Sequence, residues 1–178
     1  LKGYYQKKNI KTVLKSIELI NNLGYKIEDI NLVNGLKNIV ANTGLQGRWQ
    51  ILQKKPMIIC DTAHNEAAIK EVVYQLTKLE YYNLHFIIGF SDDKELEKIS
   101  KIFPVIGKYY FVKPNIKRGK DAEQVKKIFE RYLRIGKSFK SVIRAFNYVK
   151  KICNENDIIF VGGSTFVVSE LIALINKK

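Results

Sequence analysis

The amino-acid sequence predicts an α/β protein in which a mostly parallel sheet carries helices on both faces, preceded by an N-terminal helical segment. From about residue 48 onward, short apolar runs alternate with helical patterns, which is typical of a sheet covered by helices. These runs are apolar at nearly every position, as in parallel strands that are buried on both faces. The residues before about 43 show the helical period instead.

The N-terminal segment is predicted to contain two helices. Apolar residues recur with the helical period over about 6–23, and Gly24 ends that helix. A shorter helix is expected over about 28–40. The turn cluster Asn42-Thr43-Gly44 follows it, so we place a domain boundary there, between a helical unit (1–43) and an α/β unit (44–178).

The second unit alternates strands and helices along the chain. The expected strands cover about 48–53, 57–60, 84–88, 109–112 and 158–161. The expected helices cover about 65–79, 93–102, 121–133, 141–152 and 165–175. Asp121 and Gln124 stand at capping-box spacing at the start of the third of these helices. Ligands of open α/β sheets bind at the carboxyl ends of the strands, so the residues that follow each strand are the candidates for a site.

The chain is strongly basic, with a formal net charge of +14 over 178 residues. A basic chain can bind nucleic acid through its phosphates. Here the lysines are scattered along the sequence, and no stretch alternates arginine with aromatic residues as single-strand binding surfaces do. We therefore favour scattered surface lysines over a nucleic-acid interface, although both interpretations predict attraction to anions.

The remaining composition disfavours several kinds of site and location. Cys60 and Cys153 lie far apart in apolar runs, which favours buried free thiols in a reducing compartment. His64 and His85 are the only histidines, so a histidine-rich metal site is excluded and no metal ligand is predicted. There is no signal peptide and no apolar run of about 20 residues, so a soluble, cytoplasmic protein without a membrane span is expected. The missing initial methionine suggests a fragment, although processing or removal of a tag would have the same effect.

The segment Asp61-Thr62-Ala63-His64-Asn65 is the first candidate site. It joins a buried strand to a helix, whose N-terminus offers unpaired N–H groups and a partial positive charge to a phosphate or carboxylate. Asp61 could accept hydrogen bonds from ribose hydroxyls, and His64 could donate one to an anionic oxygen. The alternative, which the pattern alone slightly favours, is that Asp61 and Asn65 only cap the helix and that His64 packs locally.

A second strand-to-helix turn, Gly162-Gly163-Ser164, has the same character. Its glycines allow the backbone to approach a ligand closely, and Ser164 can either cap the helix or contact the ligand. The turn is neither a Walker A loop nor a complete dinucleotide fingerprint. Ser164 also lies outside a Gly-x-Ser-x-Gly elbow, so a hydrolase triad with His64 and Asp61 is not favoured. The residues themselves thus indicate an α/β domain that binds an anion or a nucleotide.

The order of these motifs resembles the folylpolyglutamate synthase and dihydrofolate synthase branch of the Mur ligase superfamily. That branch has a Gly-Arg pair before a strand, similar to Gly47-Arg48, and an Asp-Gly-Ala-His-Asn motif, similar to residues 61–65. Thr62 replaces the glycine of that motif and would be strained if its φ had to be positive. The other similar features are the N-terminal Gly-x-x-Gln-x-x-Asn segment that ends at Asn9, the pair Asp93-Lys94, the turn at 114–118 and the pair Gly163-Ser164.

The resemblance implies a domain structure and a role for each of five residues. Residues 1–43 would be the helical tail of the family's central ATPase domain, and residues 44–178 would be its Rossmann-like C-terminal domain. Asn9 would contact the adenine of ATP, Arg48 the phosphates and Asp61 the ribose. His64 and Ser164 would be the catalytic pair, facing the incoming glutamate or the reacting phosphoryl group.

The activity implied by the resemblance is that of an ATP-dependent amide ligase. ATP would phosphorylate a folate or dihydropteroate carboxylate, L-glutamate would attack the acyl phosphate, and phosphate would leave. The P-loop and most Mg²⁺ ligands would belong to the central domain upstream, so the segment alone would be inactive; a monomer is expected. The residues leave open an alternative, a non-enzymatic basic module that binds nucleic acid or another polyanion with an affinity that falls steeply with salt.

Overall fold

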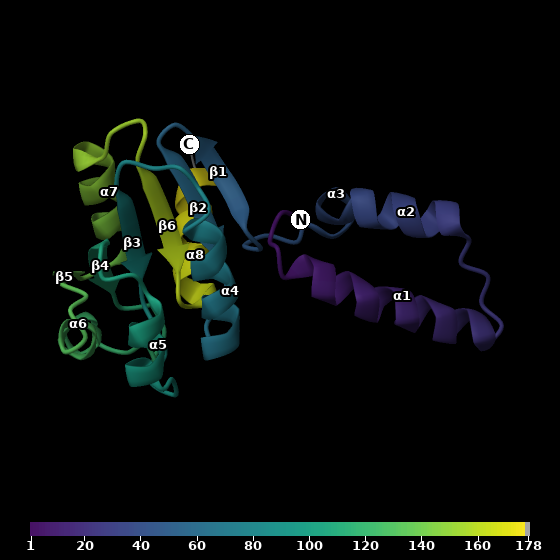
Figure 1. Cartoon of the computed structure of the whole chain (residues 1–178), viewed down its shortest axis with the longest axis horizontal. Coiled ribbons are helices and arrows are strands. Elements are labelled where there is room, and N and C mark those ends of the chain that lie inside the picture. Colours follow the sequence, from purple (N-terminus) through teal and green to yellow (C-terminus); the bar gives the residue numbers. More distant parts are fainter. Residues whose placement is uncertain (177–178) are drawn as a thin grey trace.

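The computed structural model describes residues 1–176 and shows a helix-covered sheet from which a helical arm extends (Figure 1). The arm contains α1 (Gln6–Asn22), α2 (Asp29–Lys37) and α3 (Ile39–Thr43). The strands are β1 (Gln50–Lys54), β2 (Met57–Asp61), β3 (Leu84–Ile88), β4 (Lys108–Val112), β5 (Gly136–Phe139) and β6 (Ile158–Gly162). The helices that cover the sheet are α4 (Glu66–Leu76), α5 (Leu96–Ile102), α6 (Ala122–Glu130), α7 (Val142–Ile152) and α8 (Thr165–Asn176).

The six strands form one sheet in the order β1-β2-β6-β3-β4-β5. Four of the neighbouring pairs are parallel, and only β1 and β2 are antiparallel. That exception follows from the connection, because only Lys55 and Pro56 separate the paired residues Lys54 and Met57. A parallel pair needs a crossover of a dozen or more residues, and a link this short can therefore only make a hairpin. The predicted mostly parallel α/β fold is confirmed.

Two hydrophobic clusters lie on the two faces of this sheet. The first contains buried residues of α4, α5 and α6 and includes an aromatic group in which Phe86 and Tyr109 stack with centroids 5.1 Å apart. The second packs α7 and α8 against the other face. β3 and β6 lie between these two clusters and are buried at every position, as expected of strands that are apolar apart from His85 in β3.

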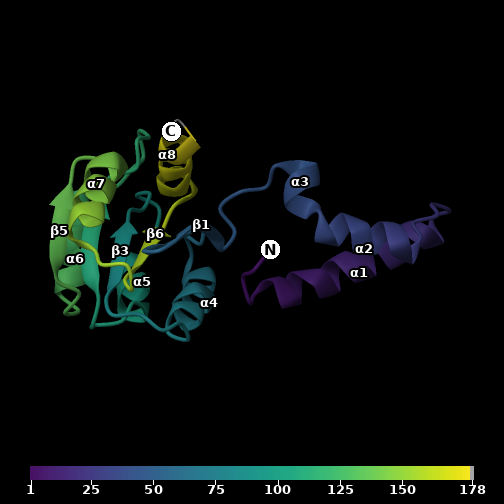
Figure 2. The same cartoon turned by 90° about the horizontal axis from the view of Figure 1, so that it is seen from above.

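The helical arm differs from the rest of the molecule in having no buried residue on α1, α2 or α3. Its apolar side chains are largely exposed, including Leu14 and Ile30. Figure 1 and Figure 2 show the arm projecting away from the sheet, with α1 and α2 both extending along its length. The single helix predicted over 28–40 is divided at Asn38, which ends α2 and precedes α3.

A buried polar cluster lies at the edge of the sheet where β3 and β6 begin. The His85 ring is fully buried, with Nδ1 3.0 Å from the Tyr110 hydroxyl and Nε2 3.2 Å from Oδ2 of Asp157. Asp157 also accepts hydrogen bonds from both the backbone and side-chain nitrogens of Asn83 and from the backbone N–H of Asn154. Burial lowers the pKa of His85. Burial alone would raise the pKa of Asp157, but these hydrogen bonds and His85 lower it on balance.

Several expected boundaries shift by a few residues. The helix expected to end near 79 ends at Leu76, and the one expected to begin near 93 begins at Leu96. Asp121 caps α6 as its spacing suggested, accepting from the N–H groups of Glu123 and Gln124. Strand β5 was not predicted. Among residues 1–176, no helix has both the length and the apolar character needed to cross a membrane.

Candidate functional site

The residues singled out from the sequence lie at one edge of the sheet. Asp61 at the end of β2 is level with Gly162 at the end of β6, and Ile88 at the end of β3 pairs with the same glycine. Because β1 runs antiparallel to β2, its first residues also lie at this edge. Arg48, His64 and Ser164, which flank these strand ends in the chain, therefore belong to the carboxyl edge of the parallel strands, where open α/β sheets bind their ligands.

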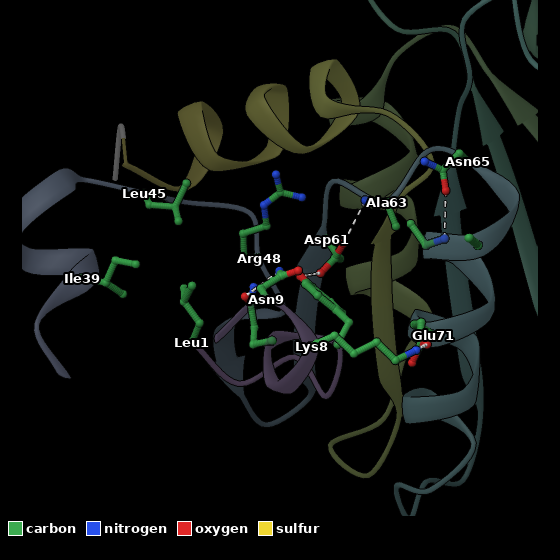
Figure 3. A pocket seen from close by; sticks show the side chains of 14 residues that line it. Leu1, Lys8, Asn9, Ile39, Leu45, Arg48, Asp61, Ala63, Asn65 and Glu71 are labelled. Atoms are coloured by element: carbon green, nitrogen blue, oxygen red, sulfur yellow. Dashed lines mark hydrogen bonds and ion pairs between the residues drawn. The ribbon is translucent and has the colours of Figure 1, made fainter. Parts of the chain in front are cut away.

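A cavity of about 600 Å³ lies where the helical arm meets this edge. One wall comes from residues 1–9 and the arm, and the other from the starts of β1 and α4 and the end of β2. The residues that line it are Leu1, Tyr5, Gln6, Lys8, Asn9, Ile39, Leu45, Arg48, Asp61, Ala63, Asn65, Ala67, Ala68 and Glu71. The structure therefore places Asn9, Arg48 and Asp61 around one space (Figure 3).

Asp61 is the most constrained side chain of this cavity, with 1% of its surface exposed. Its Oδ2 accepts hydrogen bonds from the Tyr5 hydroxyl at 2.7 Å and from the backbone N–H of Trp49 at 2.7 Å. Its Oδ1 accepts one from the N–H of Ala63 at 2.8 Å. Burial raises the pKa of Asp61, against the opposing effect of these hydrogen bonds and of the nearby Arg48. The carboxylate thus has three hydrogen-bond donors from its own chain. The ribose contact expected of Asp61 stays a prediction.

Arg48 extends from a turn that is tied to β2. Gly47 accepts a hydrogen bond from the N–H of Thr62 at 2.9 Å and has a φ of 73°. A Cβ at Gly47 would lie 2.8 Å from the methyl group of Thr62, so the turn needs glycine for both space and conformation. Thr62 itself does not have a positive φ, so the strain considered for it does not arise. Figure 3 shows the exposed guanidinium of Arg48 pointing away from Asp61.

The first residues of the chain hold the arm side of the cavity in place. The side-chain amide of Gln75 on α4 accepts from the N–H of Tyr4 at 2.7 Å and donates to the carbonyl of Lys2 at 3.0 Å. Lys8 pairs with Glu71 at 2.5 Å. Burial, reinforced by the Asp61 carboxylate, raises the pKa of Tyr5. The Tyr5 hydroxyl therefore remains a neutral hydrogen-bond donor to Asp61.

The predicted catalytic pair, His64 and Ser164, does not line the cavity. His64 is exposed, and its Nδ1 lies 3.0 Å from the carbonyl oxygen of Thr62. Ser164 is 5% exposed, and its Oγ accepts from the N–H of Phe166 at 3.2 Å, at the start of α8. Asn65 caps α4 by accepting from the N–H of Ala68, which is the capping role weighed for it. The roles of His64 and Ser164 stay predictions.

Sequence reasoning missed Tyr5, Lys8, Glu71 and Gln75 as parts of this region. Each acts through a partner far away in the chain, and Tyr5 and Asp61 are 56 residues apart. No local pattern carries such a pairing. Among residues 1–176, no group of three or more His, Cys, Asp or Glu side chains is arranged to hold a metal ion.

A mostly parallel, doubly covered sheet with a cavity at its carboxyl edge defines the Rossmann-like class of α/β ligand-binding domains. Within that class, the family model described as Mur ligase, glutamate ligase domain matches residues 47–165, which is more than half of the chain. The chain belongs to this family.

Curated relatives confirm the branch to which the motifs pointed, and a solved structure shares the fold. A probable bifunctional folylpolyglutamate synthase/dihydropteroate synthase of Haloferax volcanii is 28% identical over 74% of this chain and 16% of its own length. A dihydrofolate synthase/folylpolyglutamate synthase of Escherichia coli is 27% identical over 82% of this chain and 34% of its own. A folylpolyglutamate synthase of Mycobacterium tuberculosis, solved with ADP, aligns with all of this chain and 41% of its own, with a TM-score of 0.85 and 17% identity.

The aligned segments cover most of this chain but only part of each relative. The chain spans about a third or less of these two curated relatives. The Mycobacterium tuberculosis alignment extends over the helical arm as well as the sheet, so both parts of the chain share a known fold. The family match favours a ligase domain over the basic binding module that the charge alone left open.

Proposed function

We propose that this chain is the C-terminal part of an ATP-dependent ligase that adds L-glutamate to the carboxylate of a folate or dihydropteroate through an acyl phosphate. The proposal is supported by membership of the glutamate ligase domain family and by relatives named as folylpolyglutamate and dihydrofolate synthases. The observation that carries it is that Asn9, Arg48 and Asp61 line one and the same cavity. Most of the machinery for phosphoryl transfer is proposed to lie in an additional domain.

The cavity suits a nucleotide in size and in lining. Its volume of about 600 Å³ falls in the range of small-molecule sites. Ile39 and Leu45 offer apolar surface for a base, and the amide of Asn9 can both donate to and accept from ring atoms. Arg48 provides a planar, permanently charged group that binds phosphate through two hydrogen bonds. We assign Asn9 to the adenine and Arg48 to the phosphates.

His64 and Ser164 are proposed to act toward the glutamate or the reacting phosphoryl group. Both lie at the carboxyl edge of the sheet, on the turns after β2 and β6. An exposed imidazole can donate to an anionic oxygen without first breaking a buried contact. Ser164 would have to give up the weak contact from Phe166 to reach a ligand. Because residues 1–176 contain no group of three or more His, Cys, Asp or Glu side chains that could hold a metal ion, no step through a metal is assigned to them.

Nucleotide binding by this chain tests the proposal directly. We expect ADP to bind weakly in a calorimetric titration and Arg48→Ala to reduce its affinity about tenfold or more, because an arginine–phosphate pair is a charge-assisted hydrogen bond. Arg131→Ala is the matched control, since this exposed arginine pairs with Glu97 away from the cavity. Equal affinity of wild type and Arg48→Ala for ADP would remove the phosphate role of Arg48.

Turnover is to be measured on a protein that also contains the proposed additional domain. There we expect the Arg48→Ala variant to lose most ATP-dependent addition of glutamate to tetrahydrofolate or dihydropteroate, because phosphoryl transfer depends on positioning and charge neutralisation. Wild-type activity in Arg48→Ala would contradict the proposed function.

A further inference from the structure

The turn that carries Arg48 has an unusual backbone. Trp49, immediately after Arg48, has a φ of 47°, and Gly47, immediately before it, has a φ of 73°. A positive φ is uncommon for a bulky residue such as tryptophan and persists only where the surroundings hold it. Arg48 therefore lies between two residues of left-handed conformation, and the direction of its side chain depends on whatever fixes them.

Both sides of this turn are fixed by the end of β2. On one side, the N–H of Thr62 donates to the carbonyl of Gly47 at 2.9 Å. On the other, the N–H of Trp49 donates to Oδ2 of Asp61 at 2.7 Å, a charge-assisted hydrogen bond in a site with 1% exposure of the carboxylate. The Trp49 side chain is itself 4% exposed, so its N–H is well removed from water.

Asp61 in turn is held from two further directions. The N–H of Ala63 fixes Oδ1, and the Tyr5 hydroxyl shares Oδ2 with Trp49. A carboxylate with three internal hydrogen bonds keeps a single orientation, so the Trp49 N–H that it accepts is held in one place. No other side chain among residues 1–176 is bonded to that N–H.

We propose that Asp61 is a positioning residue: through the N–H of Trp49 it locks the Gly47–Trp49 turn and thereby fixes the place of Arg48 at the rim of the cavity. The inference deepens the proposed nucleotide site and rests on Arg48 as its phosphate-binding group. This positioning role differs from direct contact with the ligand. In direct contact, the Asp61 carboxylate would accept hydrogen bonds from the sugar, and its charge would repel the phosphates.

The structure of an Asp61→Ala variant tests the geometry without any ligand. We expect a crystal structure in which Trp49 leaves its positive φ and the backbone at Arg48 moves from its place at the rim of the cavity. Tyr5→Phe is the matched control, because it removes one hydrogen bond from the same oxygen and leaves the Trp49 contact intact. An unchanged turn in Asp61→Ala, or an equally disturbed turn in Tyr5→Phe, would overturn the proposal.

Binding of inorganic tripolyphosphate, which has no sugar or base, separates positioning from direct contact. We expect Arg48→Ala and Asp61→Ala each to weaken binding about tenfold, and the double variant to be no weaker than Arg48→Ala alone. Loss of a negative charge near the site would by itself tighten phosphate binding, so unchanged or tighter binding by Asp61→Ala contradicts the proposal. Additive losses in the double variant contradict it as well.

The two experiments fail in different ways. If Arg48→Ala binds tripolyphosphate as wild type does, the phosphate role of Arg48 in the proposed function is wrong, and the crystal structure still decides whether Asp61 holds the turn. If Asp61→Ala does not fold, hydrogen exchange of the wild-type protein replaces it. The Trp49 amide is then expected to be protected as strongly as the amides of β2, and rapid exchange of that amide would overturn the proposal.

Discussion

At the scale of single residues, Asp61 differs most from what its place in the sequence suggests. A polar residue at the end of a buried strand is a candidate ligand contact, and the motif 61–65 was recognised on that basis. The structure shows the carboxylate shared among Tyr5, Trp49 and Ala63. Local sequence could place Asp61 at the correct edge of the sheet, but the donors that occupy it come from segments that only the tertiary fold brings together.

The buried His85 gives a residue-scale prediction about pH. The pKa of His85 is lowered on folding, so between the unfolded value near 6.5 and the lower folded value the unfolded chain binds a proton that the folded chain does not. The free energy of unfolding should therefore fall from pH 7.5 to pH 5.5, by up to about 1.4 kcal/mol. Urea denaturation at the two pH values measures the change.

Variants separate this effect from those of other groups. In His85→Gln the fall between pH 7.5 and 5.5 should shrink, whereas His64→Gln, which changes an exposed ring, should keep it. Asp157 has a lowered pKa, so its contribution is lost only as the pH falls below about 3.8, outside this window. Asp61, with its raised pKa, acts in the opposite direction but equally in all three proteins. An undiminished fall in His85→Gln would show that another group is responsible.

At the scale of elements, the strands and helices with a strong hydrophobic pattern in the sequence were predictable, and those with a weak pattern were not. β3 and β6 are buried at every position and were read correctly from their apolar runs. β5 was missed because Gly136-Lys137-Ser138-Phe139 has neither an apolar run nor clear alternation, and it is only partly buried at the edge of the sheet. It becomes a strand by pairing with β4, which is a tertiary effect.

The cap of α6 provides a prediction at this scale. Asp121 accepts hydrogen bonds from two N–H groups of the first turn that have no other helical partner. We expect Asp121→Ala to lower the free energy of unfolding by about 1 kcal/mol. Asp121→Asn, which keeps an acceptor oxygen, should lose much less. Chemical denaturation of the three proteins checks this, and an equal loss in both variants would show that the charge of Asp121, not its cap, matters.

At the scale of the whole molecule, the sheet and the arm differ in how they are stabilised. The sheet has two buried clusters, whereas the arm has no buried residue, so its helices depend on weak local stability. The sequence could show that the two regions have different patterns. It could not show that they meet around a cavity, because that arrangement depends on contacts such as Tyr5 with Asp61.

This difference predicts the course of limited proteolysis. Trypsin should cleave first in the arm, at exposed sites such as Lys26 and Lys37, and leave the sheet unit intact. Mass spectrometry of the early fragments identifies the order. Early cleavage at lysines of the sheet unit, such as Lys70 on α4, with an intact arm would contradict the assignment of lower stability to α1–α3.

The arm is fastened to the sheet at two places rather than one. The first nine residues are held by Gln75 and Glu71 on α4 and by Asp61, and the returning chain is held at Gly47 by the N–H of Thr62. Figure 1 shows that both attachments lie at the same end of the arm. A body joined at two points can swing about the line between them but resists twisting about its own length. Such a joint would let the mouth of the cavity widen or narrow along one path while the register of its two walls is preserved.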